Sequence, residues 1–283
     1  MNDKKIFFIG LGLIGGSVAK GLRMLYPGAR ITAWTRHRDR IEAAVSDGTL
    51  NDIETDMIKA ASDADVIYLC APTVRNIENL RAIAPHIRPD ALITDVGSVK
   101  SDISACAEEL KLSKQFLGGH PMCGKEKVGY EYADAALLKN AYYILTPSKE
   151  TEQRHIDMMT SVVKALGAIP KLAEPAYHDL AAAAISHVPH LAAAGLVELV
   201  RTNDNGDGFM RTIAAGGFKD TTRIASSDPA MWENICRSNT ESIHLMLRKF
   251  IDILENTDKD LIEGNFDRIN ALFAENGPYR LTM

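Results

Sequence analysis

Four short segments of the sequence hold polar side chains whose types could do chemistry: residues 94–100, 118–126, 186–190 and 215–225. Histidine exchanges a proton near neutral pH, and arginine clamps carboxylates through its planar guanidinium. Arg223 also stands beside Asp220, so a structural ion pair is an equal reading of it. Together the segments indicate a binding or catalytic site, and the candidates in and just beyond them are Ser98, His120, Ser186, His190, Gly216, Arg223 and Trp232.

The spacing of these candidates places them on definite elements. Ser98 and His120 each come at the end of an apolar run that reads as a strand. Open α/β sheets bind ligands at the carboxyl ends of their strands, so this edge is the expected place for a site. Ser186 and His190 are four residues apart in an alanine-rich stretch, and on a helix they share one face.

Two pairs of possible ligands raise the question of a metal, H-x-x-C at residues 120–123 and H-x-x-H at residues 187–190. His187 and His190 bracket a proline, and no carboxylate stands at a helpful spacing beside either pair. We therefore expect no metal site. Covalent catalysis by Cys123 is equally disfavoured.

A glycine-rich loop, Gly-Leu-Gly-Leu-Ile-Gly at residues 10–15, joins an apolar run at residues 6–9 to a helical pattern at residues 14–25. Its glycines suit a tight turn, a close approach to a pyrophosphate and close packing of helix on strand. The helix N-terminus adds unpaired N–H groups and a positive dipole end. This context predicts a dinucleotide site, although a glycine turn in another doubly wound fold is the alternative. The expected cofactor-binding residues here are Gly10, Gly12, Leu13, Ile14 and Gly15.

The end of the second expected strand bears on which dinucleotide binds. An NAD site usually has a carboxylate there for the ribose hydroxyls, whereas this sequence has Thr35, Arg36 and His37. Thr35 can hydrogen-bond a phosphate and Arg36 can pair with it in bidentate fashion. These residues favour NADP over NAD, unless the arginines are only solvated charges at a helix start.

The elements that must position these residues fall into two groups. Up to about residue 170, six apolar runs alternate with helical patterns, which predicts a mainly parallel sheet with helices on both faces. From about residue 174 onward only long helical periodicities remain, and Ser-Asp-Pro at residues 227–229 is a strong helix start. We therefore expect a Rossmann-type doubly wound α/β domain at residues 1–173 and an all-helical substrate and dimerisation domain at residues 174–283.

Composition excludes several classes of protein. Apolar residues make up 46% and charged residues 24%, and the net charge is −5 without a basic run, so nucleic acid is not an expected partner. Four scattered cysteines fit a reducing cytoplasm. Residues 1–19 and 180–197 imitate a signal peptide and a membrane span, but glycines interrupt the first, and histidines and a proline the second. We expect both to be buried elements, and no membrane association.

Taken together, these motifs resemble the prephenate and arogenate dehydrogenases of tyrosine biosynthesis. The resemblance extends over nearly the whole chain and rests on residues 10–17, 95–100, 120–126, 178–190 and 217–225. It implies a Rossmann domain, a helical domain that forms a homodimer, and an active site between them.

The resemblance also implies roles for single residues. In the family, the histidine matching His120 accepts the proton of the substrate's ring hydroxyl, and the serine matching Ser98 lies beside it. The arginine matching Arg223 binds a substrate carboxylate, and residues matching Ser186 and His190 line the same pocket. Gly216 and Trp232 are further expected substrate contacts.

The sequence departs from the family in three respects. Lys125 stands where the family often has a small hydroxyl residue, and the acidic residue common at the end of the second strand is absent. We see neither a chorismate mutase domain nor a C-terminal regulatory domain, so feedback control by tyrosine through such a domain is not expected.

Two other functions stay open on the sequence alone. A β-hydroxyacid dehydrogenase shares the glycine loop, the Rossmann domain and a helical partner domain. A nonenzymatic NADP-binding sensor would use the same loop but would not need the five polar candidates together. Prephenate and arogenate, which differ only in a side-chain keto or amino group, are not separated either.

Overall fold

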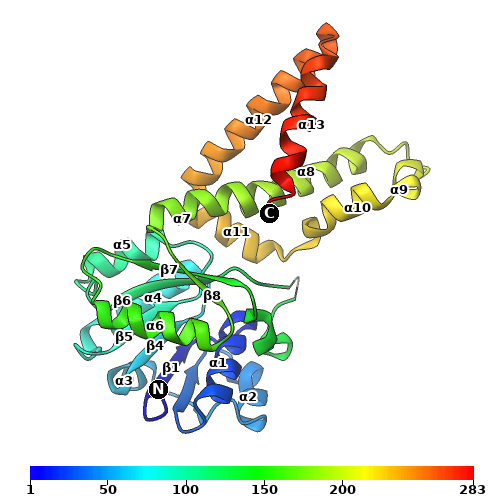
Figure 1. Cartoon of the computed structure of the whole chain (residues 1–283). Helices are drawn as coiled ribbons and strands as arrows, with labels where there is room; N and C mark the ends of the chain where they lie inside the picture. Colours follow the sequence, from blue (N-terminus) through cyan, green and yellow to red (C-terminus); the bar gives the residue numbers. More distant parts are fainter. Residues whose placement is uncertain (126) are drawn as a thin grey trace.

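One mostly parallel sheet organises the first half of the chain (Figure 1). The computed structural model describes residues 1–125 and 127–283, and these form a sheet of eight strands in the order β3-β2-β1-β4-β5-β6-β7-β8. All neighbours are parallel except β6 and β7. The strands are β1 (Lys5–Ile9), β2 (Arg30–Trp34), β3 (Asp52–Ile53), β4 (Val66–Leu69), β5 (Leu92–Asp95), β6 (Phe116–Pro121), β7 (Tyr142–Pro147) and β8 (Ile169–Leu172).

Helices cover both faces of this sheet, as the sequence predicts. The principal ones are α1 (Leu13–Leu25), α2 (Glu42–Ser46), α3 (Met57–Asp63), α4 (Thr73–Ile83), α5 (Ser101–Glu109) and α6 (Gln153–Ala165). Short 3-10 turns complete the set: η1 (Arg38–Ile41), η2 (Ala84–His86), η3 (Tyr130–Tyr132) and η4 (Ala135–Leu138).

The alternation of β1 shows how the two layers form. Ile6 and Phe8 pack into a core with residues of α1, α2 and α6, whereas Phe7 and Ile9 pack into a second core with residues of α3, α4 and α5. A parallel strand covered on both faces is apolar throughout, which is why residues 6–9 read as one continuous run. The doubly wound fold is therefore confirmed.

Two strands were not expected from the sequence. Strand β3 is only two residues long, and β8 is a mostly exposed edge strand that contains Pro170. Proline is tolerated on an edge strand because its missing N–H faces away from the ladder. Both segments therefore lack the apolar pattern that reveals the six central strands.

The rest of the chain is helical, as expected. It comprises α7 (Pro175–Ala182), η5 (Ala183–His187), α8 (Val188–Asn203), α9 (Phe209–Ile213), α10 (Gly216–Thr222), η6 (Arg223–Ser226), α11 (Pro229–Ser238), α12 (Thr240–Glu263) and α13 (Phe266–Arg280). Asp228 caps α11 by accepting a hydrogen bond from the Met231 N–H, and Pro229 is the first residue of that helix, so this helix start is confirmed.

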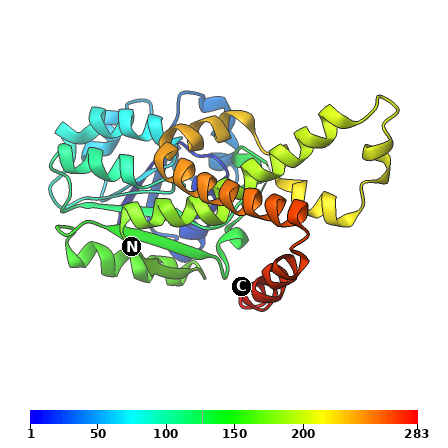
Figure 2. The same ribbon diagram turned by 90° about the horizontal axis from the view of Figure 1, so that it is seen from above.

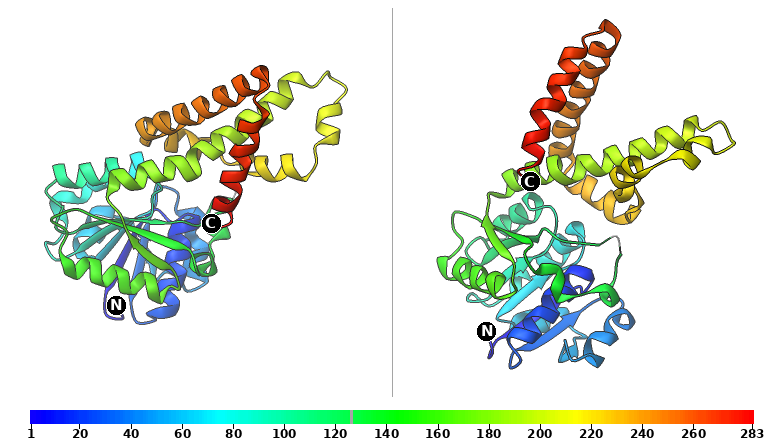
Figure 3. Two further views of the ribbon diagram at one scale, coloured as in Figure 1. Left: turned by 45° about the horizontal axis from the view of Figure 1, so that its top comes forward. Right: turned by 45° about the vertical axis from the view of Figure 1, so that its right-hand side comes forward.

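The helical part is spread out rather than compact. Helices α12 and α13 form a hairpin that projects from the other elements, and α8 with α9 extends sideways beyond the sheet (Figures 1, 2 and 3). Ile243 is the only buried residue of α12, and no described residue of α13 is buried. The α12–α13 hairpin therefore has almost no core of its own within one chain.

The two segments that imitate targeting signals have different outcomes. Residues 1–19 form β1 and the first half of α1 and are largely buried, as expected. The expectation that residues 180–197 are buried is wrong. They lie in a continuous helix from Pro175 to Asn203 that is, among the described residues, the one long and apolar enough to cross a membrane, and 28% of its most apolar window is buried. Within one chain the extended helical part offers no second layer to cover this helix.

Candidate active site

The glycine loop lies at the carboxyl edge of the sheet, between the parallel strands β1 and β4, whose following helices α1 and α4 pack on opposite faces. Gly10 has a φ of +84°, and a Cβ there would stand 3.0 Å from the backbone nitrogen of Ala71, so the turn requires glycine. A Cβ at Gly15 would collide with Cys70. The absence of a side chain at this position therefore lets α1 pack closely against the end of β4. A Cβ at Gly12 would meet open space, so the loop can be approached from outside.

The first turn of α1 has free capacity for an anion. Leu13 and Ile14 begin the helix, its N-cap Gly12 gives no side-chain hydrogen bond, and the turn contains no acidic residue. Unpaired N–H groups and the helix dipole therefore face the open side of the loop. These features fit the pyrophosphate of a dinucleotide.

The end of β2 adjoins the loop, because the Gly10 N–H donates to the carbonyl oxygen of Trp34 at 2.8 Å. Thr35 Oγ1 accepts a long hydrogen bond from the His37 N–H at 3.4 Å. The Arg36 guanidinium lies 3.6 Å from the Glu78 carboxylate of α4, and both side chains are about half exposed. An exposed pair of this kind contributes little stability, so Arg36 can exchange this partner for a phosphate at small cost.

A buried ion pair lies beneath the other end of the site. Lys100 and Asp95 are almost completely buried, and the Lys100 ammonium contacts the Asp95 carboxylate and donates to the Gly119 carbonyl oxygen at 2.9 Å. The Gly119 N–H donates back to Asp95 at 3.0 Å. A Cβ at Gly119 would stand 2.6 Å from the Asp95 carbonyl oxygen, so this close approach requires glycine immediately before His120.

His120 is joined to the helical part by a chain of hydrogen bonds. Its Nδ1 lies 2.8 Å from Nε2 of His178 in α7, and His178 Nδ1 lies 2.8 Å from the Asp179 carboxylate. Asp179 also accepts the backbone N–H groups of Lys100 and Ser101, each at 2.7 Å, where α5 begins. Strand β6, helix α5 and helix α7 therefore meet at one buried carboxylate.

The surroundings of His120 keep its imidazole neutral. Burial lowers the pKa of His120 well below its usual value, and the nearby Lys100 ammonium adds to the shift. Burial tends to raise the pKa of the Asp179 carboxyl, but hydrogen bonds from His178, Ser101 and Lys100 outweigh it and hold that pKa below its usual value. At neutral pH the site thus presents a neutral imidazole beside a carboxylate.

The candidates on α8 and α11 also come together. The rings of His190 and Trp232 lie 4.1 Å apart, and His190 Nδ1 bonds the carbonyl oxygen of Ser186 at 2.8 Å. Ser186 lies in η5, a π-helical turn, and such turns often occur at functional sites. His187, on the same turn, is buried against Trp232 and is 3.2 Å from Nδ2 of Asn239.

Arg223 and Gly216 are placed by elements that pack on the same helix. Gly216 begins α10 and Arg223 begins η6, and both elements contact α8, which carries His190. The Arg223 side chain is exposed. Ser98, in the loop after β5, makes no side-chain hydrogen bond within residues 1–125 and 127–283.

Both halves of the chain match family models. Residues 18–171 match the prephenate dehydrogenase nucleotide-binding domain, and residues 174–275 match the prephenate dehydrogenase dimerization domain. The chain belongs to the prephenate dehydrogenase family. It is 36% identical to the prephenate dehydrogenase of Bacillus subtilis over 92% of this chain and 70% of that protein.

Two solved structures of the family resemble the chain throughout. The prephenate dehydrogenase of A. aeolicus, in complex with hydroxyphenyl propionate and NAD+, has a TM-score of 0.92 and 29% identity, covering 99% of this chain and 98% of that one. Synechocystis arogenate dehydrogenase has a TM-score of 0.85 and 30% identity, covering 98% of each chain. A relative named for prephenate and a relative named for arogenate therefore both share the architecture of this chain.

Sequence reasoning missed part of this prephenate dehydrogenase site. His178 and Asp179 entered only as members of a matching stretch, and neither was singled out as bearing on His120. The signal available was the His-Asp dipeptide itself, which lies near the start of the helix that begins at Pro175. Glu126, in the segment around His120, lies outside the described residues, while Lys125 is exposed and lines an open hollow with Lys127 and Glu131.

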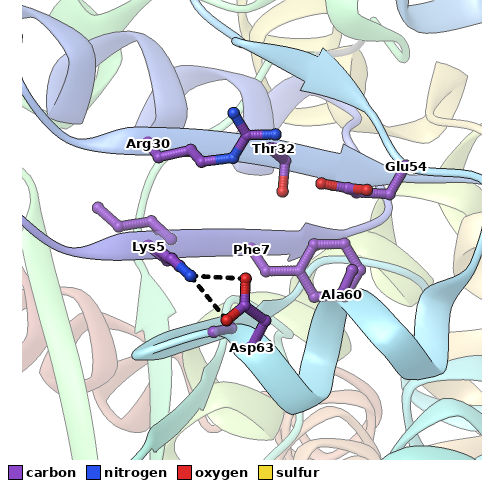
Figure 4. Close-up of a pocket in the computed structure, with 9 residues that line it drawn as sticks. Lys5, Phe7, Arg30, Thr32, Glu54, Ala60 and Asp63 are labelled. Carbon is purple, nitrogen blue, oxygen red and sulfur yellow. Dashed lines mark hydrogen bonds and ion pairs between the residues drawn. The ribbon is translucent and has the colours of Figure 1, made fainter.

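A small pocket elsewhere plays no part in the site. Figure 4 shows it between β1, β2 and α3, where Lys5 is paired with Asp63. Lys5 and Arg30 are the first residues of their strands, so the pocket lies away from the carboxyl edge that carries the glycine loop. Its volume of about 30 Å³ admits a water molecule but no dinucleotide.

The buried His187 predicts a measurable acid sensitivity. Burial lowers the pKa of His187 to about 4, with Asp179 opposing the shift and His178 and His190 adding to it. The unfolded chain binds a proton here below about pH 6.5, but the folded chain does not until about pH 4, so stability falls as the pH drops through that window. Between pH 7 and pH 5 we expect the wild type to lose about 2 kcal/mol more unfolding free energy than His187→Asn.

Urea unfolding at pH 7, 6 and 5 measures this difference. Asparagine keeps an acceptor where Nδ1 faces Asn239, so the variant retains that contact. His86→Asn, at an exposed position, is the matched control and should follow the wild type. Parallel curves for the wild type and His187→Asn would contradict the assignment.

Proposed function

We propose that this chain oxidatively decarboxylates prephenate or arogenate, giving 4-hydroxyphenylpyruvate or tyrosine. The observation that carries this is the neutral, partly buried His120, held at the sheet edge that also bears the glycine loop. Such a group is suited to accept a hydroxyl proton at neutral pH. The family membership and the named relatives support the substrate class.

The residues of the loop are suited to hold the cofactor. Gly10, Gly12 and Gly15 leave room for the backbone to approach the cofactor, and the backbone amides of Leu13 and Ile14 would hold its pyrophosphate. When bound, the nicotinamide dinucleotide supplies the hydride acceptor, as in any dehydrogenase of this kind. The glycine geometry and the uncapped start of α1 support this assignment.

The remaining residues bind the substrate and handle its proton. We assign His120 as the proton acceptor with Ser98 beside it, and Arg223 and His190 as the groups that hold the two substrate carboxylates. Ser186, Gly216 and Trp232 complete the substrate contacts. His120 takes the ring-hydroxyl proton as the carbinol carbon is oxidised. The ring carboxylate then leaves as CO2, its bonding electrons aromatise the ring, and His120 returns the proton to the phenolate oxygen.

The domains divide this work. Residues 1–173 form the dinucleotide-binding domain and residues 174–283 the substrate and dimerisation domain. The direct passage from β8, ending at Leu172, to α7, beginning at Pro175, supports this division. We place the enzyme in the cytoplasm, in tyrosine biosynthesis, and its four free cysteines suit a reducing compartment.

Loss of His120 tests the function. Steady-state kinetics with prephenate and arogenate, each with NAD+ and NADP+, should show turnover whose rate falls only at pH values well below 6.5, because the His120 pKa is lowered. His120→Asn should reduce kcat by about 10²- to 10⁴-fold and abolish that acid limb. Arg223→Ala, the companion variant, should raise the substrate KM and keep the acid limb.

A folded His120→Asn enzyme with near-normal rate would refute the catalytic role of this residue. Dinucleotide binding without turnover of either substrate by the wild type would favour the sensor function instead.

The cofactor preference is proposed to be NADP, on the strength of Arg36 at the end of β2. Removing a charge-assisted phosphate contact costs about 1.5–3 kcal/mol, so Arg36→Ala should raise the KM for NADP+ more than tenfold and change that for NAD+ little. Arg75→Ala is the control, because Arg75 is also paired with Glu78. Equal losses for both cofactors in Arg36→Ala would refute the 2′-phosphate role.

We also propose a homodimer built from the helical part. The chain exposes 15710 Å² of surface, against about 12,000 Å² for a compact monomer of 31.0 kDa. Much of the excess is apolar, since large side chains of α12 and α13 such as Ile262, Phe266 and Phe273 are 65–79% exposed. Surfaces of this kind mark association sites.

Light scattering tests the dimer. We expect about twice the mass of 31.0 kDa for the wild type, and a lower mass or unfolding for Ile262→Asp, because a charge would be placed in an apolar interface. Lys59→Asp, at an exposed position of α3 in the nucleotide domain, should leave the mass unchanged. A monomer mass independent of concentration would contradict the proposal.

A further inference from the structure

We propose that His178 and Asp179 are positioning residues that set the tautomer of His120 and leave its Nε2 free to accept the substrate proton. The inference deepens the proposed function and rests on it for the identity of the proton donor. The position of the proton on the His120 ring does not depend on whether substrate is bound. In this arrangement the sheet domain supplies the base, and the helical domain determines which of its nitrogens can accept a proton.

Asp179 fixes the direction of the hydrogen bonds in this chain. Its carboxylate accepts the backbone N–H groups of Lys100 and Ser101, which can only donate. It is 2% exposed, and Asn239, the residue just before α12, donates to its backbone carbonyl at 2.9 Å, so the residue is held from two sides. An ionised carboxylate is purely an acceptor, and the bond to His178 Nδ1 must therefore be donated by His178.

The direction of that bond fixes the next one. A neutral imidazole with its proton on Nδ1 has a lone pair on Nε2, and Nε2 of His178 lies 2.8 Å from Nδ1 of His120. His120 must then donate from Nδ1. Its own lone pair is left on Nε2, the atom that makes no hydrogen bond among the described residues. This is the arrangement that a proton acceptor needs.

The opposite arrangement would disable the base. If His178 donated from Nε2, it would carry two protons and a positive charge. His120 would then accept this hydrogen bond on Nδ1 and hold its own proton on Nε2. The groups that face the pair from β5, from the start of α5 and from η5 are Asp95, Lys100 and His187. The Lys100 ammonium is already present among them, and a second cation against His120 adds like-charge repulsion.

The same chain assists the proton transfer itself. When the substrate O–H bond breaks and a bond from Nε2 to the proton forms, His120 becomes an imidazolium whose Nδ1–H still donates to His178. The negative charge of Asp179 then acts through His178 to oppose the repulsion from Lys100. An aspartate that orients a histidine and stabilises its charged form, without taking the proton, does comparable work in serine proteases.

The first experiment locates the proton without using activity. Histidine ring ¹⁵N spectra of the full chain at neutral pH distinguish a protonated Nδ1 from a protonated Nε2, with His120→Asn identifying the resonances. We expect His120 protonated on Nδ1 in the wild type, and a shift towards protonated Nε2 in His178→Leu. A wild-type His120 protonated on Nε2 overturns the inference, whatever the enzyme's activity.

The second experiment measures the consequence for turnover. His178→Leu should lower kcat about 10- to 100-fold while both KM values stay within about twofold, a smaller loss than that expected for His120→Asn. His178→Gln should recover much of the rate, because its side-chain oxygen can accept from His120 Nδ1. Asp179→Asn, which removes the charge, should move the acid limb of kcat to lower pH.

Controls separate positioning from simple damage to the fold. His86→Gln, at an exposed position, should leave kcat and the acid limb unchanged. Equal loss in the leucine and glutamine variants, or a loss seen in KM alone, overturns the positioning role. If His178→Leu does not fold, the wild-type and His178→Gln spectra still decide the tautomer. Absence of turnover in the wild type would instead refute the proposed function and leave the tautomer result standing.

Discussion

The buried carboxylate of Asp179 is the contact on which the arrangement of this protein depends. It caps the first N–H groups of α5, holds His178, and belongs to the first helix after the sheet. A buried carboxylate with three good donors is stable, whereas the same group with one donor missing would be costly. The two parts of the chain can therefore approach each other in essentially one way at this point, and that way places His178 against His120.

The polar groups beneath the site form a balanced set. Lys100 and Asp95 are buried together, and burial lowers the pKa of the lysine while the aspartate opposes the shift. A buried ion pair contributes little net stability but defines a geometry, since either partner alone would be an uncompensated charge. Its position explains the two glycines before His120: the strand must pass close to the pair, and side chains at residues 118 and 119 would collide with Thr146 and with Asp95.

The helical part has a different basis for its stability. Its small buried residues, such as Ala182, Ala183 and Ala193, let α7, η5 and α8 pack closely near the site, but the outer helices bury almost nothing. Their apolar side chains have no partners of sufficient area inside one chain. The long apolar helix from Pro175 to Asn203 likewise has apolar surface that one chain does not cover. A helix that is apolar on most sides requires either lipid or further protein around it.

The sequence by itself determined the elements and their type, because they depend on local patterns. Continuous apolar runs specify the six strands β1, β2, β4, β5, β6 and β7, the glycine loop specifies the turn before α1, and Asp228 with Pro229 specifies the start of α11. It also supplied the candidates His120, His190 and Trp232, since their residue types stand out against apolar surroundings.

Only the tertiary structure decided which of them meet. The contact of His120 with His178 joins residues 58 positions apart, and the cap that Asp179 provides for α5 joins residues 79 and 78 positions apart. No local periodicity encodes such a pairing, because it arises from the way two domains pack. The same holds for the exposure of residues 180–197: an apolar sequence predicts burial, but whether the cover comes from the same chain depends on how many layers the fold provides.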